Sequence, residues 1–333
     1  MNIKLIKLIW LLMYYCVVLS FSQTIVLFSY IIGKHNIVQI LRDALFELAS
    51  YMYVYGFESP IYFKGNYNAT NKVDCVVVNH TSTIDFIPYI TLIRQFDDRP
   101  IYIVSKKELG YVPGSGIIML LCDDIMLDRD LDKDTDKIIN KIKTIKNGII
   151  LIFPEGTRFS PDKYKKSLEY SKTNNLHIFQ NTLYPKMKGL WLICNTLDEL
   201  GRMGNIIDIT CLVEKMYMKE SSMGNMLIND FGSTYGVINT YEWLNDKLNN
   251  YEEFKKWFLN VWTIKDNIIN TIISDDYIRC KPELHTSSYI ILNIITSVFL
   301  YLMYHTNGLY LPISLIATYI SVFNRGGGEV CLI

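Results

Sequence analysis

The clearest chemical signal in the sequence is a histidine followed five residues later by an aspartate. His80 and Asp85 lie in Asn79-His80-Thr81-Ser82-Thr83-Ile84-Asp85, directly after the apolar residues 76–78. A carboxylate at this spacing can hold one imidazole nitrogen protonated, which leaves the other nitrogen free to take a proton from a substrate hydroxyl. The pair is therefore a candidate general base with its orienting partner.

The same residues also fit a structural role. Ser82 and Asp85 have the spacing of a capping box, in which the carboxylate closes the start of a helix. A capping carboxylate can still reach the imidazole of His80, so the two roles are compatible. A second motif is needed to decide between them.

That second motif is Phe153-Pro154-Glu155-Gly156-Thr157-Arg158, which follows the apolar residues 149–152. Gly156 permits a tight turn whose neighbouring amides can face an anion. Arg158 can bind a phosphate through two parallel N–H groups. The motif can therefore present backbone amides and a guanidinium group to an anion.

Together the two motifs resemble those of the glycerophospholipid acyltransferase family, the 1-acylglycerol-3-phosphate O-acyltransferases. The signatures of this family are a histidine with an aspartate five positions on and a Phe-Pro-Glu-Gly-Thr segment. The likeness covers residues 73–273. Residues 183–189, with a Pro-x-x-x-Gly block, and residues 257–266, with Lys265-Asp266 at a helix end, are similar to the lysocardiolipin and lysophosphatidate acyltransferase branch.

The resemblance implies a transfer of a fatty acyl group from acyl-CoA to the free hydroxyl of a lysophospholipid. The expected acceptor is 1-acyl-sn-glycerol-3-phosphate, which would become phosphatidic acid. His80 would be the general base and Asp85 would set its tautomer. Glu155, Gly156, Thr157 and Arg158 would bind the phosphate and glycerol of the acceptor. Because the thioester is already activated, we expect no metal ion and no cofactor besides the co-substrate acyl-CoA.

Weaker phosphate-binding candidates come from a Lys-x-x-Leu…Pro-x-x-Gly segment, which in this family precedes a basic residue. In this sequence the pattern selects Lys106 and Arg129. The alternative for Arg129 is a surface arginine paired with the neighbouring aspartates. The lysine cluster at residues 163–166 is either a solvated face or a surface that attracts anionic headgroups or the CoA phosphates.

Other functions remain compatible with these motifs. A lysocardiolipin or other lysophospholipid-remodelling acyltransferase, a CoA-independent transacylase and a glycerol-3-phosphate acyltransferase would use the same pair. A non-catalytic lipid-binding or membrane-scaffolding protein would retain only the fold. Against the scaffold stand the intact residues of both motifs, since a decayed site is expected to lose at least one of them.

The composition indicates a membrane rather than a nucleic acid as the partner. Lys+Arg and Asp+Glu number 33 each, so the net charge is zero, whereas nucleic-acid-binding proteins are usually basic. Half of the residues are hydrophobic, and the apolar surplus lies at the two ends of the chain. The seven cysteines show no zinc-ligand spacing and are predicted to be reduced packing residues of a cytosol-facing protein.

The elements that must position these motifs follow from the alternation of apolar runs with amphipathic segments. This rhythm predicts an α/β fold with a mostly parallel sheet flanked by helices, together with N-terminal and C-terminal membrane helices. We expect strands at residues 73–78, 100–104, 149–153, 178–184 and 206–213, and helices at 84–94 and 130–147.

The chain is predicted to have four parts. They are a membrane anchor helix or helical hairpin (1–33), an interfacial amphipathic helix and linker (34–72), the acyltransferase catalytic domain (73–284) and a C-terminal hydrophobic hairpin and tail (285–333). A membrane span needs about 20 apolar residues. We therefore expect an integral protein of an endoplasmic-reticulum-type or other intracellular membrane, with its site facing the cytosol, where acyl-CoA resides.

Overall fold

The computed structural model describes residues 18–19, 22, 24–82, 84–111, 115–214, 232–243, 250–272 and 277–306. The chain divides into a helical unit (residues 1–52, 105–129 and 283–333) and a sheet unit (residues 53–104 and 130–282). Most of the predicted N-terminal anchor and the second half of the predicted C-terminal hairpin lie outside the described residues. Those two predictions therefore stay predictions.

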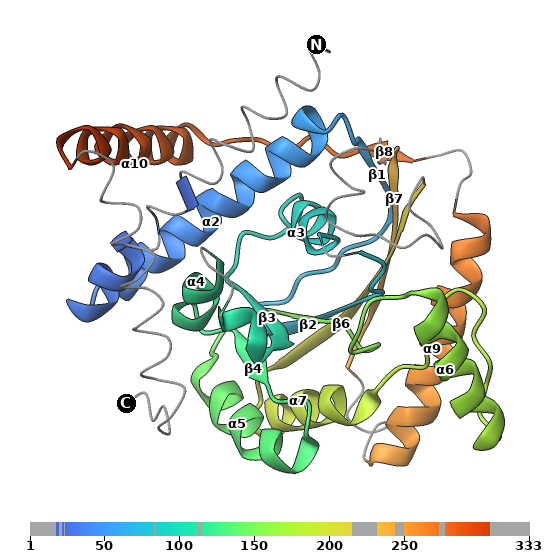
Figure 1. The fold of residues 1–333 in the computed structure, drawn as a ribbon. Coiled ribbons are helices and arrows are strands. Elements are labelled where there is room, and N and C mark those ends of the chain that lie inside the picture. Colours follow the sequence, from blue (N-terminus) through green and yellow to red (C-terminus); the bar gives the residue numbers. More distant parts are fainter. Residues whose placement is uncertain are drawn as a thin grey trace. The chain divides into compact units, whose positions relative to one another are not determined.

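The sheet unit is built around a central sheet whose strands lie in the order β3-β5-β2-β6-β7-β1-β8 (Figure 1). The strands are β1 (Ile61–Gly65), β2 (Val73–Val78), β3 (Ile101–Lys106), β5 (Gly148–Ile152), β6 (Met203–Val213), β7 (Thr234–Tyr241) and β8 (Ile278–Arg279). Pairing is parallel from β3 through β5 and β2 to β6, and between β1 and β7. The pairs β6–β7 and β1–β8 are antiparallel. The predicted mostly parallel α/β fold is confirmed.

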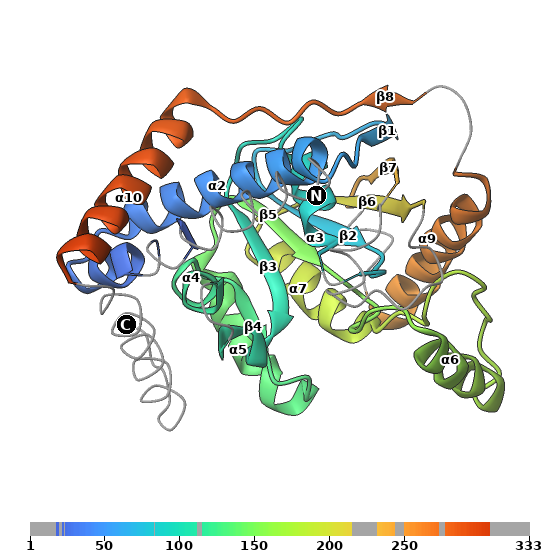
Figure 2. The ribbon, with the colours of Figure 1, turned by 45° about the horizontal axis from the view of Figure 1, so that its top comes forward.

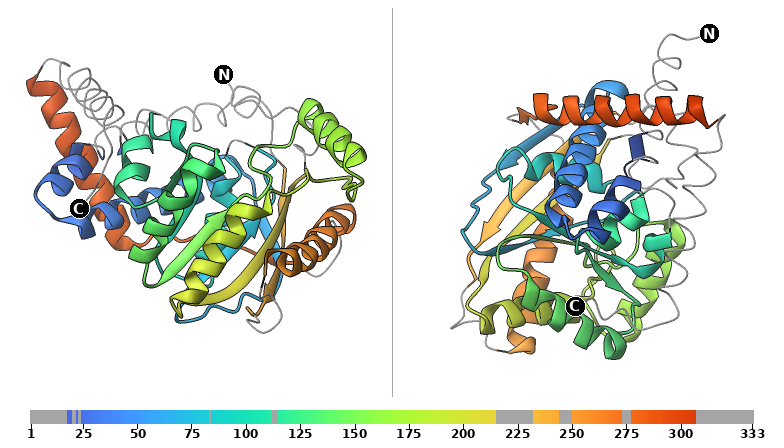
Figure 3. Two further views of the ribbon diagram at one scale, coloured as in Figure 1. Left: turned by 90° about the horizontal axis from the view of Figure 1, so that it is seen from below. Right: turned by 90° about the vertical axis from the view of Figure 1, so that its left-hand side faces the viewer.

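Helices cover both faces of this sheet. Two views place α3 (Phe86–Ile93) on one face and α5 (Leu131–Thr144), α7 (Met187–Glu199) and α9 (Tyr251–Thr271) on the other (Figures 1 and 3). Every residue of β2 and β5, which lie side by side in Figure 2, is buried. Strands covered on both faces are mostly apolar, which explains why the sequence predicts these two strands even though β2 contains the buried Asp74.

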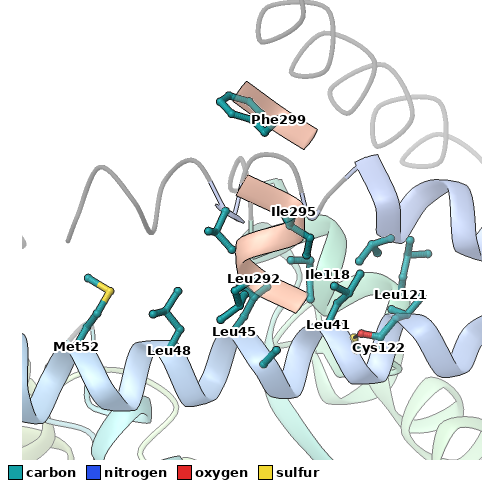
Figure 4. Packing of buried hydrophobic residues seen from close by; sticks show 14 residues of the cluster. Leu41, Leu45, Leu48, Met52, Ile118, Leu121, Cys122, Leu292, Ile295 and Phe299 are labelled. Carbon is teal, nitrogen blue, oxygen red and sulfur yellow. Dashed lines mark hydrogen bonds between the residues drawn. The ribbon is translucent and has the colours of Figure 1, made fainter. Parts of the chain in front are cut away.

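The helical unit is held together by apolar side chains from three helices, α2 (His35–Tyr51), α4 (Ser115–Leu121) and α10 (Thr286–His305). Figure 4 shows how the apolar stripe of α2 meets side chains of α4 and α10. The buried residues labelled there include Leu41, Leu45, Leu48, Ile118, Leu121, Leu292, Ile295 and Phe299. The helix predicted from residue 34 is present, and its amphipathic pattern is explained by this packing.

Among the described residues, α10 is the one helix long and apolar enough to cross a membrane, judged by length and composition. It has 20 residues and a mean hydropathy of 1.6, and 22% of its apolar window is buried. At 1.5 Å per residue it is about 30 Å long, close to the thickness of the hydrocarbon core. The apolar run at 289–304 thus forms a longer helix than the sequence indicated.

Several predicted elements differ from the structure. Residues 178–184 form a loop rather than a strand, since their amide N–H groups are bonded by side chains of other elements. Strand β1 lies inside the predicted linker 34–72, and the sequence analysis predicts neither β7 nor the two-residue strand β8. Helix α5 ends at Thr144, and Gly148 is the first residue of β5, with a φ of +135°.

Candidate active site

The candidate site lies where β2 and β5 end. The two strands are parallel, and Val77 is in register with Ile152, so the residues that follow them emerge at the same edge of the sheet. The ring of His80, after β2, lies 4.6 Å from the ring of Phe153, after β5, measured between centroids. Ligands of open α/β sheets bind outside the carboxyl ends of the strands, which is where both motifs lie.

The predicted pair of His80 and Asp85 is formed. His80 Nδ1 lies 2.9 Å from Asp85 Oδ2, and the same oxygen accepts the amide N–H groups of Thr81 at 2.7 Å and Ser82 at 3.0 Å. The bond to Ser82 closes the turn directly before α3, whose N-cap residue is Asp85 itself. The structural role and the histidine contact are therefore made by one carboxylate.

The geometry fixes the tautomer of the imidazole. A carboxylate can only accept hydrogen bonds, so Nδ1 of His80 carries the proton and Nε2 is left as the nitrogen able to take one. The Asp85 side chain is 3% exposed, whereas that of His80 is 23% exposed. The carboxylate of Asp85 is thus shielded from solvent, and the imidazole of His80 remains accessible to a substrate.

Asn79 fixes the strand end that carries His80. Its side chain donates to the carbonyl of Cys211 on β6 at 2.8 Å and accepts the amide N–H of Cys211 at 3.0 Å. The hydroxyl of Tyr89 on α3 donates to the Asn79 carbonyl at 2.7 Å. Burial raises the pKa of Tyr89 well above its usual value, so Tyr89 stays a neutral donor. The sequence analysis does not predict a role for Asn79 or Tyr89. The position of Asn79 directly before His80 was the one sequence feature that could have indicated its role.

Glu155 joins three loops. Its Oε1 accepts the amide N–H of His80 at 2.9 Å, and its Oε2 accepts that of Leu183 at 3.3 Å. The residue is 3% exposed, and burial raises the pKa of its carboxyl to about 7. These contacts make Glu155 a support of the His80 backbone. Its predicted contact with the acceptor stays a prediction.

The turn from Glu155 to Phe159 is attached to His80 at both ends. Glu155 accepts from the amide of His80, and the amide of Phe159 donates to the carbonyl of His80 at 2.7 Å. Gly156 has a φ of +66°, a conformation that favours glycine, and its amide donates to Phe153 within the turn. The predicted binding residues Gly156 and Thr157 therefore lie in the middle of a turn anchored on the candidate base, and Arg158 follows them.

Helix α9 holds the loop that supports Glu155. The Asp266 carboxylate accepts the amide N–H groups of Gln180 and Asn181 and the hydroxyl of Thr182, each at 2.8 Å. Trp262 Nε1 donates to the carbonyl of Leu183 at 3.1 Å. These bonds explain why the predicted strand at 178–184 is a loop.

The sequence likeness placed Lys265 and Asp266 at a helix end, but α9 continues to Thr271. Lys265 is fully buried, lies 2.9 Å from Asp208 on β6 and donates to the carbonyl of Ile209 at 2.8 Å. Burial raises the pKa of Asp208. Lys265 thus binds α9 to the sheet, and Asp266 binds the same helix to the loop of residues 180–182.

The two weaker phosphate candidates belong to the helical unit, whereas His80 belongs to the sheet unit. Lys106 is the last residue of β3 and is half-buried, and Arg129 is exposed two residues after β4 (Ile125–Leu127), with a φ of +66°. The predicted roles of both stay predictions.

Within the described ranges no group of three or more side chains could hold a metal ion, and the five described cysteines are free and buried.

Comparison with known proteins agrees with the motifs. The Acyltransferase family model matches residues 61–193, which contain both of them. Lysophosphatidylinositol acyltransferase 10 of Caenorhabditis elegans is 26% identical over 213 residues, which are 60% of this chain and 53% of that protein. Human 1-acyl-sn-glycerol-3-phosphate acyltransferase gamma is 26% identical over 140 residues (40% and 37%). Lysocardiolipin acyltransferase 1 of Danio rerio is 27% identical over 140 residues (40% and 36%).

A solved structure shares the fold. The crystal structure of the 1-acyl-sn-glycerophosphate acyltransferase PlsC from Thermotoga maritima matches with a TM-score of 0.51 and 17% identity, covering 82% of this chain and 100% of that one. The chain spans about half or less of the length of the three curated relatives described above. The matched domain and the curated relatives support the glycerophospholipid acyltransferase family for this chain, and the solved structure shares its fold.

Proposed function

We propose that this protein transfers a fatty acyl group from acyl-CoA to the free hydroxyl of a lysophospholipid. The contact between His80 Nδ1 and Asp85 Oδ2 at 2.9 Å carries the proposal, because it prepares Nε2 to remove a proton from a hydroxyl. The names of the relatives support the reaction class, since all three are acyltransferases whose names refer to glycerophospholipids.

In the proposed mechanism His80 acts twice. Nε2 removes the proton of the acceptor hydroxyl as its oxygen attacks the thioester carbonyl, and Asp85 stabilises the imidazolium that forms. The tetrahedral intermediate collapses with cleavage of the carbon–sulfur bond, and the leaving CoA thiolate takes the proton back from Nε2. The products are the diacyl lipid and free CoA, so the reaction needs no cofactor beyond its co-substrate.

The proposed acceptor is 1-acyl-sn-glycerol-3-phosphate, which gives phosphatidic acid. Its hydroxyl and its phosphate are close together on one glycerol, as are His80 and the turn of residues 155–159 in the structure. Gly156, Thr157 and Arg158 would contact the phosphate, with Lys106 and Arg129 as further candidates. Among the relatives, human acyltransferase gamma carries this acceptor in its name.

We further propose that the protein resides in an endoplasmic-reticulum-type or other intracellular membrane, with the site facing the cytosol. The exposed apolar side chains of α10, which include Ile290, Ile294 and Val298, support a bilayer as partner. A lipid acceptor and cytosolic acyl-CoA would then meet at the same membrane surface.

The test is acyl transfer in membranes that contain the full-length protein. Radiolabelled oleoyl-CoA would be offered with lysophosphatidate, lysophosphatidylinositol, lysophosphatidylglycerol, monolysocardiolipin or glycerol 3-phosphate. We expect label in phosphatidic acid above all other products. A folded, membrane-bound protein that transfers label to none of these acceptors would contradict the proposal and favour a transacylase or a scaffold.

A further inference from the structure

Two lysines outside both signature motifs reach the turn of residues 155–159. A Cβ added at Gly156 would lie 3.3 Å from Cδ and 3.5 Å from Nζ of Lys186, so the Lys186 side chain lies along Gly156. The ammonium group of Lys163, on α6 (Pro161–Thr173), donates to Thr157 Oγ1 at 2.7 Å. Two positive charges thus flank consecutive residues of the turn.

Backbone contacts fix the position of both lysines. The amide of Lys186 donates to the carbonyl of Pro154 at 2.7 Å, which ties the chain before α7 to the start of the turn. Lys163 lies in the first turn of α6, and its amide donates to the hydroxyl of the N-cap residue Ser160. Helix α6 also directs the positive end of its dipole toward residues 158–160.

We propose that Lys163 and Lys186 bind the phosphate of the acceptor and give the site a preference for a phosphomonoester over a phosphodiester headgroup. This inference rests on the proposed function and adds two residues and a headgroup class to it. Together with Arg158, the two lysines place three cationic side chains on or beside one turn.

Charge explains the preference. A phosphomonoester carries between one and two negative charges near neutral pH, whereas a phosphodiester such as that of lysophosphatidylinositol carries one. The attraction to each ammonium group grows with this charge. Removing one lysine should therefore weaken binding of a monoester acceptor more than that of a diester acceptor.

The position near His80 indicates the acceptor rather than acyl-CoA, which also carries phosphates. Two carbons separate the reacting hydroxyl of lysophosphatidate from its phosphate ester oxygen. In acyl-CoA the whole pantetheine arm separates the thioester from the phosphates. A phosphate held by a turn that is bonded to His80 at both ends therefore fits the acceptor.

The test is steady-state kinetics of full-length Lys186→Gln and Lys163→Gln in mixed micelles, with lysophosphatidate and lysophosphatidylinositol as acceptors. We expect the KM for lysophosphatidate to rise about tenfold, since one charge-assisted hydrogen bond is lost. The KM for lysophosphatidylinositol should rise about threefold or less, because the diester carries a smaller charge. Neither kcat nor the KM for oleoyl-CoA should change.

Matched controls separate these lysines from general surface charge. Lys188→Gln and Lys166→Gln remove exposed lysines two and three residues away, and Lys186→Arg keeps the charge. The two glutamine variants should behave as the wild type, whereas Lys186→Arg, which keeps a cation in the proposed site, should restore most of the affinity for lysophosphatidate that Lys186→Gln loses. Melting temperatures equal to that of the wild type would show that every variant is folded.

Three results would overturn the inference. They are lysine variants that equal their controls, a rise in the KM for oleoyl-CoA instead of the acceptor, and a wild type that prefers lysophosphatidylinositol. In each of these cases the wild type is active and the proposed acyl transfer stands, although the third result would also contradict lysophosphatidate as the proposed acceptor. A wild type inactive on every acceptor would contradict the proposed function itself.

Discussion

One carboxylate oxygen organises the candidate base. Asp85 Oδ2 receives His80 Nδ1 and the amides of Thr81 and Ser82, so the backbone that carries the histidine and its ring are oriented by the same atom. Glu155 supports the amide of His80 from another loop. The position of the imidazole therefore depends on two buried carboxylates with different partners.

Replacing Asp85 with asparagine tests the first of these carboxylates. The asparagine amide can donate to Nδ1, which would move the ring proton to Nε2 and remove the base. We expect kcat to fall about 10²–10⁴-fold with little change in KM. Asp98→Asn, at an exposed aspartate, is the matched control. An Asp85→Asn enzyme with kcat within threefold of the wild type would show that Asp85 only holds the turn before α3.

Replacing Glu155 with glutamine tests the second buried carboxylate. The Glu155 carboxyl has a pKa of about 7 when folded, against 4.5 for an unperturbed carboxyl. The folded state therefore keeps a proton that the unfolded state loses, and its stability falls as pH rises through this window, by about 3 kcal/mol. Glutamine cannot titrate.

The measurement for Glu155 is the difference in melting temperature between the wild type and Glu155→Gln at several pH values. As the pH rises from about 5 to about 8, the melting temperature of the wild type should fall relative to that of Glu155→Gln. A constant difference across this range would mean that Glu155 is ionised throughout.

The sequence predicted His80 and Asp85 because their contact spans five residues and follows an apolar strand. It did not predict that the Glu155 carboxylate bonds the amides of His80 and Leu183, which come from other segments of the chain. Residue spacing can predict a contact between residues that are close in sequence, such as His80 and Asp85. Contacts between distant segments, such as those of Glu155, depend on the tertiary fold, and no short sequence motif predicts them.

At the scale of elements, α9 fixes the loop of residues 180–183. Asp266 accepts two backbone amides and one hydroxyl of this loop, and Trp262 bonds its end at Leu183. Leu183 then donates to Glu155. The chain of contacts therefore runs from a distant helix through a loop to the backbone of the candidate base.

Asp266→Ala should destabilise the protein. Truncation leaves the amides of Gln180 and Asn181 without their acceptor, which costs about 3 kcal/mol. The melting temperature should fall by roughly 6–12 °C for a domain of this size. Glu252→Ala, at an exposed position of the same helix, should change it little. If the two variants melt at the same temperature, the loop is not held by Asp266.

The elements that the sequence predicted best are those with a continuous pattern. Strands β2 and β5 are buried along their whole length and, apart from Asp74, carry no polar side chain, because both faces are covered. Residues 178–184 have spaced apolar side chains, which predict a strand, but the side chain of Asp266 accepts the amides of Gln180 and Asn181. Whether these residues form a strand or a loop therefore depends on the position of α9, which lies about 70 residues further along the chain.

At the scale of the molecule, α10 combines a packed face with an exposed apolar face. Leu292, Ile295 and Phe299 pack within the helical unit (Figure 4). Ile294 and Val298 are 58% and 42% exposed. Apolar side chains on both faces of one helix support the proposal that the exposed face contacts lipid.

Cysteine labelling tests this contact. Ile294→Cys should react with a water-soluble maleimide about tenfold more slowly in intact membranes than in detergent, because lipid excludes both the reagent and the thiolate. Lys188→Cys, at an exposed position of the sheet unit, should react at the same rate in both. Peptide mass spectrometry separates these sites from the native cysteines. Equal labelling of Ile294→Cys in both conditions would place α10 in water.

The most direct test of the proposed mechanism is oleoyl transfer to lysophosphatidate by full-length His80→Ala, with His177→Ala as the matched control. His177 is exposed on the loop before Phe179 and has no carboxylate five residues on. We predict that His80→Ala loses the activity, by 10²-fold or more, and that His177→Ala keeps it. Retained transfer by a folded His80→Ala protein would contradict a general-base role for His80.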